Sequence, residues 1–169
     1  METVSTTISL ILYSLVLHPE WQSKLRDNLK DTCKDKKITS DILNESKLLD
    51  AIVKESLRVY PAANRLFRII QKDCTLKNYK LKAGELVSIN IYGLHMDPDF
   101  WEEPEKFNPQ RNCIGKRLAL TEIKYFITKI ILHHNVFVTE KTDIPLSLFK
   151  NENSLALNKL FLGFEKLYK

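Results

Sequence analysis

The spacing of apolar residues predicts helices over the first part of the chain. Residues 3–17 are mostly apolar and predict a buried helix. It is expected to end near residue 18, because the residue before a proline is disfavoured in the helical conformation. Pro19 then suits the first turn of a second helix that runs to about Thr32. The apolar face of this second helix repeats every four residues, at Trp21, Leu25 and Leu29.

Two further helices are predicted before residue 61. A charged link at residues 34–37 is followed by Thr39 and Ser40, either of which can cap a short helix. A longer amphipathic helix comes next and stops at Pro61, which removes a backbone donor and clashes with a continuing helix. The apolar stripe of this longer helix consists of Leu49, Ile52, Val53, Leu57 and Tyr60.

The pattern changes to strand-like spacing at about residue 66. The segment 66–91 is expected to form strands around a turn at residues 82–85, with a strand at residues 86–89. Residues 97–110 include Pro98, Pro104 and Pro109 and are expected to be irregular. This part of the chain therefore predicts a small sheet followed by a loop.

The last part of the chain predicts one helix and then short strands. Residues 114–134 have helical spacing, and the tail at residues 136–168 alternates around a polar turn at residues 150–153, as β-hairpins do. Helices come first and strands later, so the fold class is α+β with helix dominant. The helical positions expected to face the core are Leu120, Ile123, Ile127, Ile130, Ile131 and His134.

Composition narrows the function classes. The chain has 169 residues, of which 44% are hydrophobic and 28% charged, which is ordinary for a globular domain. The net charge of +5 is spread along the chain without a basic stripe among aromatics, and nucleic-acid binding is therefore disfavoured. Three widely spaced cysteines do not form a disulfide framework and favour a reducing compartment. Cys33 and Cys74 are interpreted as structural or incidental.

The apolar run at residues 8–17 is too short to span a bilayer. The residues before it include Glu2 and no Lys or Arg, which is the wrong charge for the start of a secretory signal. A small helical membrane-associated protein is therefore disfavoured. The chain also lacks a Ser-His-Asp set, a glycine-rich phosphate loop and a CxxC pattern.

Cys113 is the strongest candidate for chemistry. It lies in the segment NCIGKR at residues 112–117, directly before a predicted helix. The free N–H groups and the positive end of a helix dipole favour a thiolate at such a position, and Gly115 allows a flat group to approach the backbone. A metal or a haem iron is the natural partner for such a thiolate ligand. By spacing alone, the alternative is a small buried hydrophobic residue.

Three segments in order resemble the cytochrome P-450 haem-thiolate monooxygenases. They are KESLRVYP at residues 54–61, WEEPEKFNPQR at residues 101–111, and the Cys113 segment. The resemblance covers nearly the whole chain and is closest to the animal microsomal branch that oxidises xenobiotics and steroids. It implies the C-terminal part of that fold: the end of the distal helix, the Glu-x-x-Arg helix, a small sheet, the cysteine loop with its helix, and terminal β-hairpins.

The resemblance also implies roles around a haem b (iron protoporphyrin IX). Cys113 would be the axial ligand of the iron. Glu55, Arg58 and Arg111 would form a buried network beneath the haem. Without the resemblance, Glu55 and Arg58 would be interpreted as a solvated pair contributing about 0.2 to 0.5 kcal/mol.

Further roles follow from the same resemblance. Arg68 would contact a haem propionate, since a guanidinium offers a carboxylate bidentate geometry. Glu2 and Thr3 align with the acid and threonine pair that delivers protons to bound dioxygen. The substrate pocket for a small lipophilic molecule would include Ala62, Ala63 and Asn64.

The chain has no nicotinamide or flavin motif of its own, so electrons are expected to come from outside, and the resemblance implies an NADPH-dependent reductase as their source. Lys116 and Arg117 lie beside Cys113, in the first turn of a helix, where cations are unfavourable. They would favour the thiolate and dock an acidic reductase. The alternative is simple solvent exposure at small cost.

The chain departs from the family in two places. By the resemblance, the part before the distal helix is expected to be missing, including the membrane anchor that would place the protein on the cytosolic face of the endoplasmic reticulum. Without that anchor, the chain is expected to be soluble inside the cell or misfolded. Arg111 also runs straight into Asn112, where the family has a meander and a Phe-x-x-Gly-x-Arg stretch.

These departures leave two interpretations open. Arg111 is either the scaffold arginine or the propionate arginine, and it cannot serve both places. Residues 1–169 are expected to form a single partial domain, with a loop missing between residues 111 and 112. The chain is then either a monooxygenase by descent that is inactive in this form, or a non-enzymatic remnant, from a splice form or a pseudogene, with weak or no haem binding.

Overall fold

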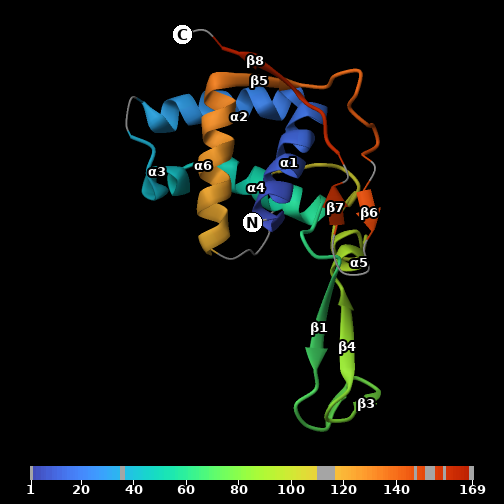
Figure 1. The fold of residues 1–169 in the computed structure, drawn as a ribbon. Helices are drawn as coiled ribbons and strands as arrows, with labels where there is room; N and C mark the ends of the chain where they lie inside the picture. Colours follow the sequence, from blue (N-terminus) through green and yellow to red (C-terminus); the bar gives the residue numbers. More distant parts are fainter. Residues whose placement is uncertain are drawn as a thin grey trace.

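A computed structural model describes residues 2–34, 37–109, 117–146, 148–150, 155–157 and 159–167. Helices form the body of the molecule, and a long β-arm projects from it (Figure 1). The helices are α1 (Glu2–Leu17), α2 (Pro19–Cys33), α3 (Ser40–Glu45), α4 (Lys47–Val59), α5 (Ile91–His95) and α6 (Arg117–His133). The strands are β1 (Arg65–Ile69), β2 (Cys74–Leu76), β3 (Tyr79–Leu81), β4 (Leu86–Asn90), β5 (His134–Phe137), β6 (Leu148–Lys150), β7 (Leu155–Leu157) and β8 (Gly163–Lys166). The helix-dominant α+β class predicted from the sequence is confirmed.

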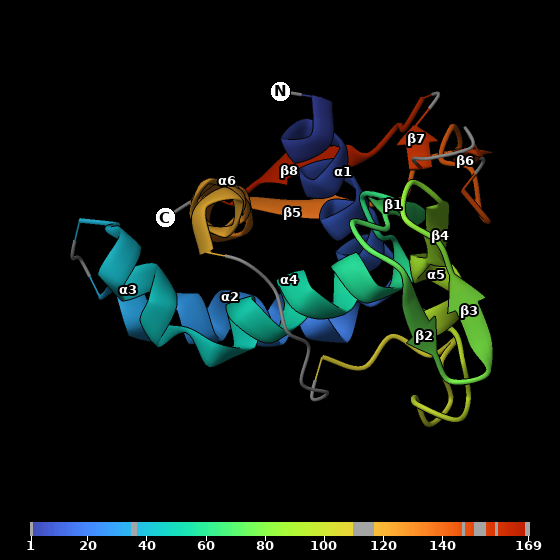
Figure 2. The ribbon, with the colours of Figure 1, turned by 90° about the horizontal axis from the view of Figure 1, so that it is seen from below.

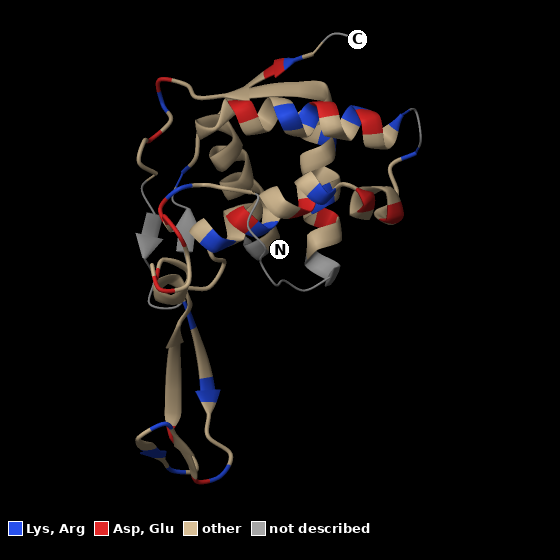
Figure 3. Ribbon diagram, turned by 180° about the vertical axis from the view of Figure 1, so that it is seen from behind, with Lys and Arg blue, Asp and Glu red and all other residues tan. Residues whose placement is uncertain are grey.

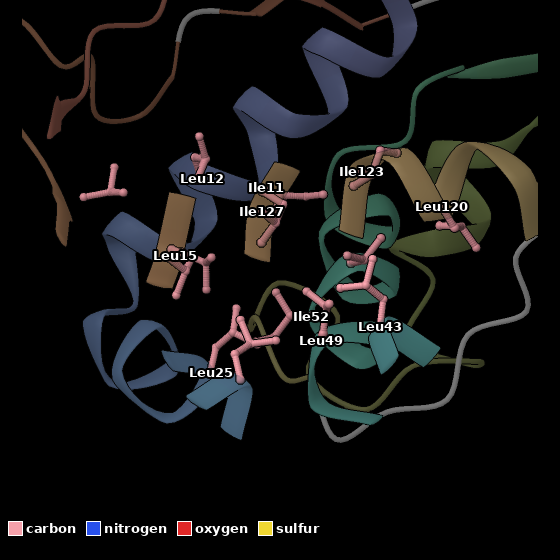
Figure 4. Close-up of a cluster of buried hydrophobic side chains, with 14 of the residues drawn as sticks. Ile11, Leu12, Leu15, Leu25, Leu43, Leu49, Ile52, Leu120, Ile123 and Ile127 are labelled. Atoms are coloured by element: carbon pink, nitrogen blue, oxygen red, sulfur yellow. The ribbon is translucent and has the colours of Figure 1, made fainter. Parts of the chain in front are cut away.

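The core lies where α1, α2, α4 and α6 meet, and each of these helices contacts the other three (Figures 1 and 2). Helix α1 is buried along most of its length, which explains why its apolar residues are nearly continuous rather than periodic. The side chains of the core are shown in Figure 4, and those with no exposed surface include Ile11, Leu15, Leu25, Leu49, Ile52 and Ile127.

The predicted helix boundaries follow from prolines and caps. Helix α2 begins at Pro19, as expected. Thr39 caps α3 by accepting a hydrogen bond from the backbone N–H of Ile42 at 3.4 Å. Ser46 caps α4 in the same way by accepting from the N–H of Leu49 at 3.1 Å. Its cap fixes the start of the helix that carries Glu55 and Arg58.

The β-arm consists of two antiparallel pairs. Strand β1 pairs with β4, so that Arg65 lies opposite Asn90 and Ile69 opposite Leu86. Strands β2 and β3 pair farther out along the arm (Figure 1). The predicted turn before β4 is present, and Gly84 adopts a φ of +89°, a conformation that favours glycine.

The C-terminal strands pair partly as predicted. Strands β6 and β7 form an antiparallel pair of the kind expected for a hairpin. Strand β5 instead pairs with the distant β8. The prediction that residue 134 faces the core from a helix is wrong, because α6 ends at His133 and β5 begins at His134.

Helix α2 explains this early end of α6. The Arg26 side chain donates from Nε to the Ile131 carbonyl at 3.0 Å and from Nη2 to the His134 carbonyl at 3.2 Å. These are carbonyls at the helix end, which need partners from outside the helix. The Gln22 amide bonds both the N–H and the carbonyl of Val136, each at 2.9 Å, and so pairs with β5 as a neighbouring strand would.

Helix α5 was not predicted. It follows β4 directly, and Asn90 caps it by accepting from the Gly93 N–H at 3.1 Å.

Charges of both signs alternate along the outer face of α2 (Figure 3). None of the helices in the described ranges combines the length and the apolar character needed to cross a membrane.

Candidate functional site

Glu55 and Arg58 form a buried ion pair on one face of α4. Arg58 donates from Nε to Glu55 Oε2 at 2.9 Å and from Nη2 to Glu55 Oε1 at 2.8 Å. The exposed fractions of the two side chains are 0% for Arg58 and 1% for Glu55. The interpretation as a solvated surface pair is therefore wrong.

The remaining donors of Arg58 bind backbone carbonyls outside α4. Nη1 donates to His95 at 2.9 Å and to Pro104 at 2.7 Å, and Nη2 donates to Lys106 at 3.1 Å. A guanidinium has five N–H donors in a fixed fork, so every donor of Arg58 has an acceptor. A lysine has three donors on a flexible stem and cannot reproduce this set.

Glu55 completes the connection to the irregular segment. Its Oε1 also accepts a hydrogen bond from the backbone N–H of Asn108 at 2.9 Å. The prolines of residues 97–109 prevent regular secondary structure there, so the backbone groups of this segment need partners elsewhere. The pair on α4 supplies several of them and thereby fixes the stretch that leads toward residues 110–116.

Several predicted site residues lie outside the described part of the structure. Arg111 and Cys113 are among residues 110–116, which the structure does not describe. Glu2 and Thr3 begin α1, but their side chains are outside the description as well. The structure therefore joins Glu55 and Arg58 and leaves the positions of these four side chains open.

The remaining predicted residues lie in the first strand of the arm and in the segment that leads into it. Arg68 is exposed on β1 and donates from Nη1 to the Phe67 carbonyl at 2.8 Å. That single bond within the described residues leaves most of its donors available to a carboxylate, so Arg68 fits a propionate partner. Ala62, Ala63 and Asn64 are half-buried. Asn64 Oδ1 is buried without a hydrogen-bond partner among the described residues.

An apolar groove lies elsewhere, between α1, α3 and α6. Its lining includes Ile8, Leu43, Tyr125 and Phe126. None of the described site candidates lines this groove. Within the described ranges, no cluster of three or more His, Cys, Asp or Glu side chains is arranged to hold a metal ion.

A second charged network joins α4 to α6. The Lys124 ammonium contacts Asp50 Oδ1 at 2.8 Å, and Lys54 contacts Asp50 Oδ2 at 2.7 Å. The Lys124 side chain is only 6% exposed, although it lies on a helix whose predicted inner face is apolar. Burial alone would raise the pKa of Asp50, but the hydrogen bonds and charges of Lys124 and Lys54 outweigh it and lower that pKa.

We expect Asp50→Asn to reduce the free energy of unfolding by about 1 to 3 kcal/mol at neutral pH, because it leaves the Lys124 ammonium buried without a counter-ion. The folded-state pKa of Asp50 is lowered, so its contribution is complete above the unfolded value of about 3.9 and is lost as the pH falls through the folded value. Urea unfolding between neutral and acid pH measures this difference.

The control for this experiment is Asp27→Asn, which changes an exposed residue of α2. It should leave the free energy of unfolding within about 0.5 kcal/mol of the unmodified chain. A difference between Asp50→Asn and the unmodified chain that persists below the folded pKa would contradict the assigned role of the Asp50 carboxylate.

Comparison of the sequence with known proteins places this chain in a family. The sequence model described as Cytochrome P450 matches residues 1–111 and 110–162. The chain is 36% identical to "Cytochrome P450 3A18" of Rattus norvegicus and 37% identical to "Cytochrome P450 3A25" of Mus musculus, each over 170 aligned positions. Each of these alignments covers 87% of this chain and 34% of the relative.

A shorter relative is similar over most of its own length. The chain is 34% identical to "Cytochrome P450 3A19" of Capra hircus aegagrus over 171 aligned positions, covering 88% of this chain and 78% of that protein. The chain thus spans about a third of the length of the rat and mouse relatives.

Proposed function

The chain belongs to the cytochrome P450 family, and from that premise we propose that it forms the haem-proximal part of a haem- and dioxygen-dependent monooxygenase of lipophilic substrates. One observation carries the proposal. The buried Glu55–Arg58 pair uses its donors and acceptors to hold the backbone that leads to Cys113. An ion pair that is desolvated this completely, and bonded mainly to an irregular segment, suits a scaffold beneath a bound group.

The cofactor in this proposal is haem b, with Cys113 as the axial ligand of its iron. When bound, it supplies the reductive cleavage of dioxygen and the insertion of one oxygen atom into the substrate. Cys113 precedes α6, and a helix N-terminus favours the thiolate over the thiol. The backbone that Arg58 holds, at Pro104 and Lys106, precedes this cysteine in the sequence.

Arginines would hold the propionates. The exposure of Arg68 and its available N–H donors support this role for Arg68. Arg111 is the second candidate, either for a propionate or as a third member of the Glu55–Arg58 network. A guanidinium binds a carboxylate through two parallel hydrogen bonds, which orient the group as well as hold it.

The remaining roles concern protons and substrate. We assign proton delivery to Glu2 and Thr3 at the start of α1, where a carboxylate and a hydroxyl can pass a proton along hydrogen bonds. The substrate pocket includes Ala62, Ala63 and Asn64, and the unpaired Asn64 Oδ1 offers an acceptor to a substrate hydroxyl.

An NADPH-dependent reductase would supply the electrons. Lys116 and Arg117 beside Cys113 would attract an acidic reductase surface and mainly raise its association rate. We place the whole protein on the cytosolic face of the endoplasmic reticulum membrane, held there by an N-terminal anchor like that of the microsomal branch. The choice of this reductase and the membrane location rest on the family alone.

A non-enzymatic remnant is the second candidate. Two observations favour it. The family match is divided at residues 110–111, just before Cys113. The alignment with the rat relative is 170 positions long but includes only 87% of this 169-residue chain. The rat relative therefore has positions in this region of similarity that lack a counterpart here. We propose that these include the loop expected between residues 111 and 112.

The test is an oxygen-transfer assay on a chimaera in which the preceding part of rat cytochrome P450 3A18 is joined to this chain and the intervening residues of that relative are inserted between residues 111 and 112. With reductase, NADPH and ¹⁸O₂, a steroid substrate should gain one ¹⁸O atom, measured by mass spectrometry. The product should be lost without NADPH. A chimaera that binds haem but yields no labelled product with any substrate tested would favour the interpretation of the chain as a non-enzymatic remnant.

A further inference from the structure

Arg58 and His95 each bond the backbone of the other. Arg58 Nη1 donates to the His95 carbonyl at 2.9 Å, and His95 Nδ1 lies 3.1 Å from the Arg58 carbonyl. A carbonyl only accepts, so Nδ1 carries the hydrogen. The Arg58 carbonyl is in the last turn of α4, where carbonyls lack partners within the helix. His95 therefore caps α4 at the residue whose side chain forms the network.

Trp101 covers the same guanidinium. Arg58 Cζ lies 5.1 Å from the centroid of the Trp101 ring, within the range of a cation–π interaction. The Trp101 ring meets the His95 ring edge to face, with centroids 6.4 Å apart and planes at 77°. Its Nε1 donates to the Leu94 carbonyl at 3.0 Å, which fixes the ring against α5.

The His95 ring is uncharged, as its position beside the Arg58 guanidinium requires. Burial lowers the pKa of His95 and the charge of Arg58 lowers it further, while the hydrogen bond to the Arg58 carbonyl acts in the opposite direction. The net pKa is below the ordinary value, so the imidazole is neutral at pH 7. A neutral ring can lie beside a guanidinium without charge repulsion and still donate from Nδ1.

We propose that His95 and Trp101 are positioning residues that orient the Arg58 guanidinium toward the carbonyls of Pro104 and Lys106. His95 fixes the backbone from which the Arg58 side chain extends, and Trp101 restricts the plane of its guanidinium. The consequence for haem binding rests on the proposed function, whereas the orientation of Arg58 does not. An experiment without haem therefore separates the two.

The experiment measures Arg58 directly in the ¹⁵N-labelled full chain by NMR. The reporters are the hydrogen exchange rates of the Arg58 Nε–H, which bonds Glu55, and of the Asn108 backbone N–H, which bonds the same carboxylate. Losing one buried hydrogen bond raises the equilibrium constant for local opening about tenfold, and the hydrogen exchange rate rises with it. We expect His95→Ala to accelerate both exchanges by about that factor.

Substitutions that preserve one atom distinguish positioning from packing. In His95→Asn, the side-chain amide N–H can replace Nδ1–H, and both exchange rates should return toward those of the unmodified chain. In His95→Gln, the amide extends past that position, and the exchange should stay fast. Trp101→Leu, which keeps an apolar side chain but has no π face, should accelerate exchange at Arg58 Nε–H more than at amides of the core helix α1.

The matched control is His133→Ala, because His133 is an exposed histidine at the end of α6. It should leave both exchange rates unchanged. The proposal is overturned if His95→Ala leaves the Arg58 Nε–H protected, or if His95→Gln restores protection as well as His95→Asn does. It is also overturned if exchange accelerates equally throughout α1, since that result would indicate general destabilisation.

Discussion

Glu55→Ala is expected to lower the free energy of unfolding by about 3 to 5 kcal/mol, because it leaves the Arg58 charge buried with no counter-ion. The Asn108 N–H would lose its acceptor in the same variant. Urea unfolding followed by circular dichroism measures the loss. Arg58→Ala should cost a similar amount, since it leaves the Glu55 carboxylate buried and three backbone carbonyls without their donor.

The double variant is the sharper part of this prediction. Glu55 and Arg58 belong to one network, so removing both should be no worse than removing either. Arg58→Lys should also be strongly destabilising, because a lysine cannot supply the five donors. Two single variants whose effects simply add would contradict a shared network.

The chain contains a matched control for the pair. Lys106 and Glu103 are also three residues apart and in contact, but the Lys106 side chain is 69% exposed and that of Glu103 is 57% exposed. Exposed pairs contribute between about 0 and 1 kcal/mol, so Lys106→Ala should have little effect. A loss for Glu55→Ala as small as that for Lys106→Ala would show that the buried position of the pair is wrong.

The sequence predicted those parts of the fold that depend on local signals. Helix α2 begins at Pro19, Thr39 caps α3, and the turn before β4 contains Gly84, as their residue types indicate. Helix α5 was missed because it is short and contains Gly93, although Asn90 offered a capping signal. The end of α6 was misplaced because Arg26 determines it from another helix.

The candidate site was predictable only in part. Spacing places Glu55 and Arg58 on one helix face, but their burial followed from the family resemblance rather than from the pattern. The partners of Arg58 outside α4 are backbone carbonyls, which any residue type carries, so no sequence signal marks them. Trp101 and His95 were missed as members of the site because their side chains contact Arg58 across a large separation in the sequence.

Lys124 shows a different limit of sequence analysis. It lies between the buried Ile123 and Ile127 on α6, and hydropathy assigns a lysine to the solvent side. Its burial depends on Asp50 of α4, which is distant in the sequence. A buried charge becomes predictable only when its partner is known.

The second large effect concerns Cys113, the residue on which the haem-thiolate proposal depends. We expect Cys113→Ser to abolish thiolate ligation in the chimaera with the rat relative, because a serine hydroxyl does not ionise at neutral pH and is a poor ligand for the iron. Cys74→Ser is the matched control, since Cys74 is an exposed free cysteine on β2. It should have no effect on the haem.

The absorbance spectrum of the reduced carbonyl complex tests this central claim most directly. The account predicts a thiolate-type Soret band for the chimaera and for Cys74→Ser, a weakened band for Glu55→Ala, and none for Cys113→Ser. The claim is contradicted if the thiolate-type band survives Cys113→Ser, or if the chimaera takes up haem and shows no such band with Cys113 in place.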